Sequence, residues 1–151
     1  MSHMYKRLLV AVDGSELSYK ALAHVVAIAE TFGSELKIVT VVPHQRYYSG
    51  ITGSSHNENI FFDIQDKLVP IYRKILTNAE AKVKSENPDM NVSTILMEGQ
   101  PSIIIVEVAE KEECDMIIMG CRRLGGILSL LEENTSRSVI NTSKIPVMII
   151  M

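Results

Sequence analysis

Short apolar runs alternate along the chain with longer stretches in which apolar residues recur at helical spacing. Most of these runs end beside a Gly, Pro or Asp, which is typical of strands that are buried on both faces of a parallel sheet. Five strands are predicted in this way, at residues 8–12, 36–42, 92–97, 116–119 and 147–150.

Four helices are predicted between the strands, at residues 17–32, 60–85, 103–110 and 135–141. Ser15 is a suitable N-cap for the first helix, and Gly33 is expected to end it. Pro70 falls inside the second helix and predicts either a kink or a division into two pieces. Pro101 stands near the first turn of the third helix, where its missing N–H group is tolerated.

The stretch from residue 44 to residue 59 has no periodic pattern. It is rich in Ser, Gly, Tyr and Asn, a composition that favours a loop or a lid. Shorter turns are predicted at residues 87–89 and 98–101, where Gly and Pro interrupt the pattern. The alternation of strands and helices predicts an α/β fold with a parallel sheet and helices on both faces. Residues 1–151 are expected to form a single domain.

Composition and charge narrow the classes of function. Hydrophobic residues make up 46% and charged residues 22% of the chain, as in ordinary globular proteins. The net charge of −3 gives no reason to expect a nucleic-acid partner. No apolar run approaches the roughly 20 residues that span a bilayer, and no signal peptide is visible, so we expect a cytoplasmic protein with no membrane contact. Cys114 and Cys121 flank a strand and are expected to be reduced thiols.

Several residues at the carboxyl ends of predicted strands are candidates for a binding site, because ligands of open α/β sheets bind there. Asp13 fits a hydrogen bond to a ribose hydroxyl, a contact through a metal ion, or a turn held by its own backbone. Gly99 and Gly120 permit either close approach of a ligand or a turn with positive φ. Arg122 and Arg123 are suited to clamp a phosphate, or to remain solvated.

Patterns for metal binding and hydrolysis are absent from the sequence. The four histidines are scattered, and no pair has ligand spacing on one helix. There is no G-x-S-x-G motif, and neither cysteine has an evident histidine partner. We therefore predict no metal site and no catalytic residues. The methionine-rich strand at residues 116–119 is expected to lie in the core.

Four segments of the chain, taken together, resemble the universal stress protein family. They are Lys-Arg-Leu-Leu-Val-Ala-Val-Asp-Gly-Ser at residues 6–15, Glu-Gly-Gln-Pro at 98–101, Asp-Met-Ile-Ile-Met-Gly at 115–120 and Lys-Ile-Pro-Val-Met-Ile-Ile at 144–150. The resemblance covers nearly the whole chain. It implies a five-stranded parallel sheet in the order 3-2-1-4-5, and a homodimer formed through the last strand, from Pro146 to Met151.

Many members of that family bind ATP or AMP, so the resemblance implies an adenine-nucleotide site, with Mg²⁺ if the ligand is ATP. Asp13 matches a position that meets the ribose, Val41 one that meets the adenine, and Met119 one beside the base. The full set of predicted nucleotide-binding residues is Ala11, Val12, Asp13, Val41, Met119, Gly120, Arg122, Arg123, Gly125, Asn134 and Thr135.

The phosphate end of this implied site departs from the family's fingerprint, which is Gly, two residues, Gly, nine residues, Gly and then Ser or Thr. Gly120 matches the first glycine, whereas Arg123 occupies the place of the second. Without a gap, the third glycine falls on Glu133 and the hydroxyl residue on Asn134; one inserted residue places Asn134 and Thr135 there instead. A glutamate beside a phosphate is a like-charge contact, and Arg123 adds bulk together with a compensating charge.

Three functional hypotheses follow from the family resemblance together with these residues. The first is a homodimeric stress-response binding or signalling module that holds mainly the adenosine half of a nucleotide. The second is slow ATP hydrolysis or phosphotransfer, with Asp13 holding Mg²⁺ and the two arginines facing the γ-phosphate. The absence of a P-loop lysine and of a general base from the sequence argues against the second hypothesis. The third is a dimeric scaffold without a nucleotide.

Overall fold

The computed structural model describes residues 4–44, 58–121 and 127–151. Strands and helices alternate in the order β1 (Arg7–Ala11), α1 (Glu16–Phe32), β2 (Glu35–Pro43), α2 (Glu58–Glu86), β3 (Val92–Gly99), α3 (Pro101–Lys111), β4 (Met116–Gly120), α4 (Ile127–Thr142) and β5 (Val147–Ile150). The strands pair in parallel in the order β3-β2-β1-β4-β5. The predicted α/β fold and strand order are therefore confirmed.

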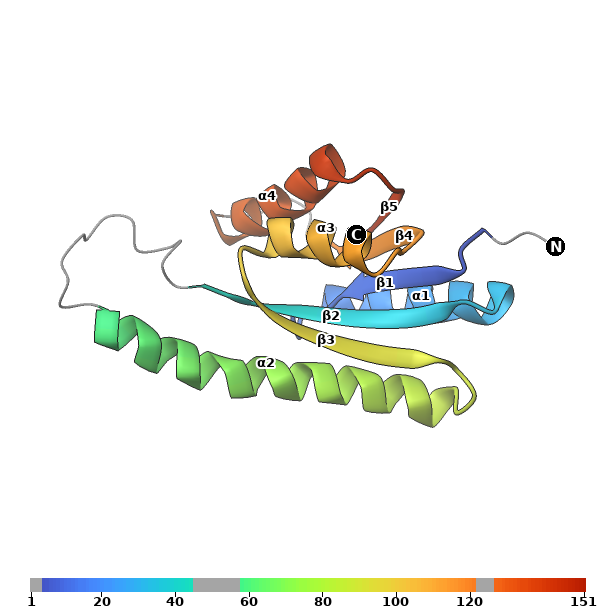
Figure 1. The fold of residues 1–151 in the computed structure, drawn as a ribbon, viewed down its shortest axis with the longest axis horizontal. Helices are drawn as coiled ribbons and strands as arrows, with labels where there is room; N and C mark the ends of the chain where they lie inside the picture. Colours follow the sequence, from blue (N-terminus) through green and yellow to red (C-terminus); the bar gives the residue numbers. More distant parts are fainter. Residues whose placement is uncertain (1–3, 45–57, 122–126) are drawn as a thin grey trace.

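Helices cover both faces of the sheet (Figure 1). Successive side chains of a strand point to opposite faces, so the central strand β1 contributes to two cores. Leu8 and Val10 pack with residues of α1 and α2, whereas Leu9 packs with residues of α3 and α4. Residues 116–119 of β4 are all buried, which confirms the expectation that they belong to the core. Within the described part of the chain, we find no helix with the length and hydropathy needed to span a bilayer.

The ends of α1 agree with the prediction. The Ser15 hydroxyl accepts a hydrogen bond from the Ser18 N–H group at 3.1 Å, which satisfies one of the free donors of the first helical turn. Gly33 follows the helix with a φ of 66°, in the left-handed region that favours glycine.

The start of α2 and its course through Pro70 correct two predictions. The helix begins at Glu58, so the predicted loop reached too far at Glu58 and Asn59; residues 45–57 lie outside the described residues. Of the alternatives at Pro70, the division into two pieces is wrong, because α2 is one helix up to Glu86. Pro70 and Asp66, whose carbonyl loses its helical partner, are both exposed, so water can replace the hydrogen bond.

Three further boundaries differ from the prediction. The last helix begins at Ile127 rather than at residue 135. The polar residues just before residue 135 are of the kind that cap helices, but in this chain they lie within the helix. The predicted turn at 98–101 is partly wrong, since Glu98 and Gly99 continue β3 and pair with the end of β2. The third helix begins at Pro101, which occupies its first turn as expected, two residues before the predicted start at residue 103.

Charged side chains join the elements at the amino ends of the strands. Arg7 Nε donates to Glu35 Oε2 at 2.8 Å, and Arg7 Nη1 donates to the backbone oxygen of Glu112 at 2.6 Å. Lys37 Nζ lies 3.4 Å from Glu35 Oε1 and 3.6 Å from Glu112 Oε2. The hydrogen bond from Arg7 lowers the pKa of Glu35. Burial raises the pKa of the nearby Cys114 thiol to about 11.

Candidate functional site

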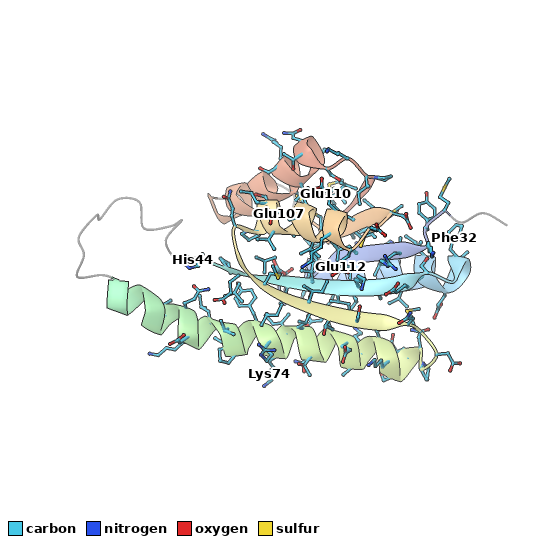
Figure 2. The ribbon with its side chains drawn as sticks, viewed as in Figure 1. Phe32, His44, Lys74, Glu107, Glu110 and Glu112 are labelled. Carbon is cyan, nitrogen blue, oxygen red and sulfur yellow. The ribbon has the colours of Figure 1, made fainter. Side chains whose placement is uncertain are left out.

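A cavity of about 290 Å³ opens at the carboxyl ends of β1, β2 and β4. In Figure 2 this is the end of the sheet at which His44 is labelled, and Phe32 marks the opposite end. The strand order reverses at β1, whose neighbours are β2 and β4, so the cavity lies where ligands of open α/β sheets bind. Its lining residues are Ala11, Val12, Asp13, Ser15, Leu17, Ser18, Val39, Val41, Pro43, Tyr72, Pro101, Ile105, Met119, Gly120 and Thr135.

Most of the residues predicted to bind a nucleotide meet at this cavity. From the strands and the turn after β1 come Ala11, Val12, Asp13, Val41, Met119 and Gly120, and from α4 comes Thr135. Arg122, Arg123 and Gly125 lie outside the described residues, and so does the side chain of Asn134. The structure thus brings together the predicted ribose and base residues, and it does not describe the predicted phosphate residues apart from Gly120 and Thr135.

Asp13 holds the turn between β1 and α1. Its Oδ1 atom accepts a hydrogen bond from the Ser15 N–H group at 2.9 Å, as the turn alternative predicts. Asp13 is nevertheless exposed at the cavity, and a carboxylate has further lone pairs, so it remains able to accept a hydrogen bond from a ligand. Gly14 follows with a φ of 85°, and a Cβ there would lie 3.0 Å from Ile75 Cδ1 of α2.

Glycine is needed for different reasons at the ends of β3 and β4. A Cβ on Gly120 would lie 2.8 Å from the backbone carbon and oxygen of Leu17, so this glycine allows the first turn of α1 to approach β4. Neither alternative predicted for Gly120 describes this role. Gly99 has the positive φ that was predicted, 149°, but it lies at the end of β3 and not in a turn, and it is not among the residues that line the cavity.

Hydrogen bonds hold the strand ends that form the cavity. The Val12 N–H group donates to the Val39 oxygen at 2.9 Å, and the buried Thr40 hydroxyl donates to the Val12 oxygen at 2.6 Å. Beside β4, the Ser136 hydroxyl donates to Cys121 Sγ at 3.2 Å, so α4 is tied to the end of that strand. Cys114 and Cys121 are both thiols that form no disulfide, as predicted.

Sequence reasoning missed the helical part of the lining. Tyr72 and Ile105 are members of ordinary apolar stripes on α2 and α3, and periodicity does not distinguish a side chain at a cavity from one in the core. Pro43 was interpreted only as the end of a strand, and Pro101 only as part of a turn and of the start of a helix. Their position beside strand ends was the one available indication that they would lie near a ligand.

The chemistry of the cavity suits a ligand with an apolar part and hydroxyl groups. Val41, Ile105 and Met119 contribute apolar surface, whereas Asp13 supplies a carboxylate and Thr135 a hydroxyl group. Asp13 carries the only formal charge among the described lining residues. Within the described ranges, no cluster of three or more His, Cys, Asp or Glu residues is arranged to hold a metal ion.

Comparison with known proteins identifies the family. The sequence model of the universal stress protein family matches residues 4–151. The universal stress protein YxiE of Bacillus subtilis is 31% identical over 149 residues, which cover 97% of this chain and 99% of that protein. The chain therefore belongs to the universal stress protein family.

Two solved structures of universal stress proteins with nucleotides share this fold. One is a complex with cAMP, which matches with a TM-score of 0.68 and 22% identity and covers 97% of each chain. The other is the protein of Archaeoglobus fulgidus in complex with dAMP, with a TM-score of 0.65 and 22% identity. That match covers 98% of this chain and 99% of the other.

Proposed function

We propose that this universal stress protein is a binding or signalling module whose cavity holds the adenosine half of an adenine nucleotide, ATP or AMP. The observation that carries the proposal is the meeting of Asp13, Val41 and Met119 at one cavity, since the family resemblance implies that these residues meet the ribose and the base. The adenine ligands of the two structurally similar universal stress proteins, cAMP and dAMP, support the same ligand class.

The proposed pose follows from the chemistry of the lining. Val41 and Met119 offer apolar surface to the base, and Asp13 offers an acceptor to the ribose hydroxyls. Thr135 lines the cavity, which supports the alignment with one inserted residue, in which the fingerprint keeps its hydroxyl. Asn134 then stands in place of the preceding glycine, and Arg123 in place of the middle one. We propose that this phosphate end is degraded and adds little affinity.

Binding without catalysis is the activity that the described lining favours. Phosphoryl transfer depends on cations that neutralise charge around the phosphate and on a group that orients the nucleophile. Asp13 alone among the described lining residues is charged, and its Oδ1 atom already holds a turn.

The proposal also includes a cytoplasmic location and a homodimer formed through residues 146–151, with Mg²⁺ needed only if ATP is the ligand.

Calorimetric titration with adenosine, AMP and ATP, each with and without Mg²⁺, tests the proposal. All three ligands should bind with affinities within about tenfold of one another, a difference of about 1.4 kcal/mol. Asp13→Asn keeps an oxygen for the Ser15 turn but removes the charge, so it should weaken all three by about tenfold or more. Asp89→Asn, an exposed turn residue outside the cavity lining, should change none of them.

Three results would contradict parts of the proposal. Much tighter binding of ATP than of adenosine would show that the phosphate end is intact. Hydrolysis of ATP that Asp13→Asn abolishes would favour an enzyme. No binding of any of the three ligands would favour the dimeric scaffold without a nucleotide.

A further inference from the structure

Tyr72 is the only aromatic residue among the described residues that line the cavity. It belongs to α2, an element to which none of the predicted site residues belongs. Leu76, Ala79 and Val83 continue the same helical stripe and are buried against the sheet. Tyr72 belongs to the same stripe but is only half-buried, and it lines the cavity instead of packing in the core.

Interactions on both sides of Tyr72 join α2 to the turn after β1 and to the end of β3. In the turn that follows, Ile75 Cδ1 lies 3.0 Å from the position that a Cβ would take on Gly14, beside the turn of Asp13. About two turns before Tyr72, the buried Gln65 donates from Nε2 to Glu98 Oε1 at 3.0 Å, near the end of β3. The backbone that carries Tyr72 is therefore fixed from both directions, and a wall that is already in place binds a ligand with less loss of entropy.

The ring of Tyr72 supplies what the rest of the apolar lining lacks. Val41, Ile105 and Met119 are aliphatic or thioether side chains, which pack against a base but do not stack on it as a ring does. Stacking between a base and an aromatic side chain tolerates any base, because every base has a π-face. The one aromatic side chain among the described lining residues is therefore suited to the flat part of a nucleotide.

Resting on the proposed function, we propose that Tyr72 forms a wall of the base subsite, so that α2 takes part in recognising the adenine. The contribution of Tyr72 then depends on the ring and not on its hydroxyl group. It applies to every ligand that carries a base, and it is absent for a sugar phosphate without a base.

Calorimetry with adenosine and with ribose 5-phosphate tests this role. Tyr72→Leu should weaken the binding of adenosine by about tenfold, within the range measured for loss of a stacked base, and should leave ribose 5-phosphate unchanged. Tyr72→Phe keeps the ring and should bind adenosine within about twofold of the original chain. Tyr19→Leu is the matched control, because Tyr19 lies on α1 and is not part of the cavity lining. Its ring instead faces Lys82, whose Nζ atom lies 5.8 Å from the ring centroid.

The possible outcomes separate this inference from the function on which it rests. If the original chain binds adenosine and Tyr72→Leu binds it equally well, the role of Tyr72 is wrong while the proposed function stands. If Tyr72→Phe is as weak as Tyr72→Leu, the hydroxyl group is responsible, and the stacking role is wrong. If the original chain binds no nucleoside at all, both proposals fall. Thermal unfolding of each variant shows whether the fold is retained.

Discussion

At residue 120 the missing side chain makes room for the backbone of another element. A Cβ there would lie 2.8 Å from the carbonyl carbon and oxygen of Leu17, in the first turn of α1. A backbone carbonyl cannot rotate away as the tip of a side chain can, so α1 or β4 would have to shift. Gly120 is thus explained by packing between these two elements, although it also lines the cavity.

Gly120→Ala should lower the free energy of unfolding by about 1–3 kcal/mol, because the added methyl group overpacks the contact with α1. Urea denaturation of the variant and of the original chain measures the difference. Gly33→Ala is a useful comparison, since nothing lies within 4 Å of a Cβ at residue 33 and its effect comes from backbone strain at a φ of 66°. A loss below about 0.5 kcal/mol for Gly120→Ala would show that α1 moves aside freely.

Single residues at strand ends were predictable as candidates, but their roles were not. The ends of apolar runs located Asp13, Met119 and Gly120, because ligands of parallel sheets bind at those ends. Whether Asp13 holds a turn, and which backbone meets Gly120, depends on the distance to an element elsewhere in the fold. The position of Tyr72 at the cavity could not be predicted either, because the apolar residues that follow it at helical spacing are buried in the core.

At the scale of elements, the ion pairs at the amino ends of the strands join β1, β2 and the end of α3, whose Glu112 is labelled in Figure 2. Arg7 makes the closest contacts of this group, with the Glu35 carboxylate and the Glu112 carbonyl. Because the hydrogen bond from Arg7 lowers the pKa of Glu35, the folded state favours the ionised carboxylate.

Glu35→Gln should lower the free energy of unfolding at pH 7 by about 1 kcal/mol, because a neutral amide pairs less strongly with Arg7 and Lys37. Since folding lowers the pKa of Glu35, its stabilising effect is complete above the unfolded-state pKa of about 4.3 and is lost as the pH falls through the lowered value. Urea denaturation at pH 7 and pH 3 measures both ends of this range.

The matched control for Glu35 is Glu110→Gln, an exposed carboxylate on α3 (Figure 2) that should change stability by less than about 0.5 kcal/mol. A difference between Glu35→Gln and the original chain that stays the same at both pH values would contradict a role for the charge.

The existence and type of the elements were readable from periodicity, whereas several boundaries were not. Residues 147–150 form β5 as predicted, because nothing in that run competes with a buried strand. The start of α4 was placed at residue 135, since the polar residues before it resemble a helix cap, but the helix begins at Ile127. Local capping preferences amount to about 1 kcal/mol, so packing of the whole helix decides where it starts.

At the scale of the whole molecule, β5 forms one edge of the sheet. The backbone oxygen of Pro146 accepts a hydrogen bond from the Ile117 N–H group in β4, and that of Ile150 accepts one from the Cys121 N–H group just after β4. In a parallel ladder alternate residues bond to the same neighbour, so the N–H and C=O groups of Val147 and Ile149 point to the outer edge. An edge of this kind can pair with a second copy of the chain, as the proposed dimer requires.

Sedimentation equilibrium should give twice the mass of the 16.8 kDa chain, because the proposed dimer pairs the outer edges of two β5 strands. Ile149→Pro removes an outward N–H group without removing a hydrogen bond to β4, so it should shift the mass toward the monomer. Circular dichroism shows whether the variant stays folded. A folded Ile149→Pro variant with the dimer's mass would exclude pairing through this edge.

The arrangement of the whole chain was predictable in class from the alternation of strands and helices. The order of the strands was not, because several orders satisfy the same pattern, and it followed from the family resemblance instead. The two cores on either side of β1 explain why the strands could be predicted from apolar runs. A strand that is covered on both faces is apolar along most of its length.

The contact between Gly120 and Leu17 also bears on how this site changes in evolution. Selection for folding alone keeps a glycine at that position, whether or not the protein still has a ligand. A lineage that gave up its nucleotide would lose the other positions of the fingerprint first and this glycine last. When related sequences are sorted into binders and non-binders, Gly120 therefore carries little information, and the other positions of the fingerprint are the better guide.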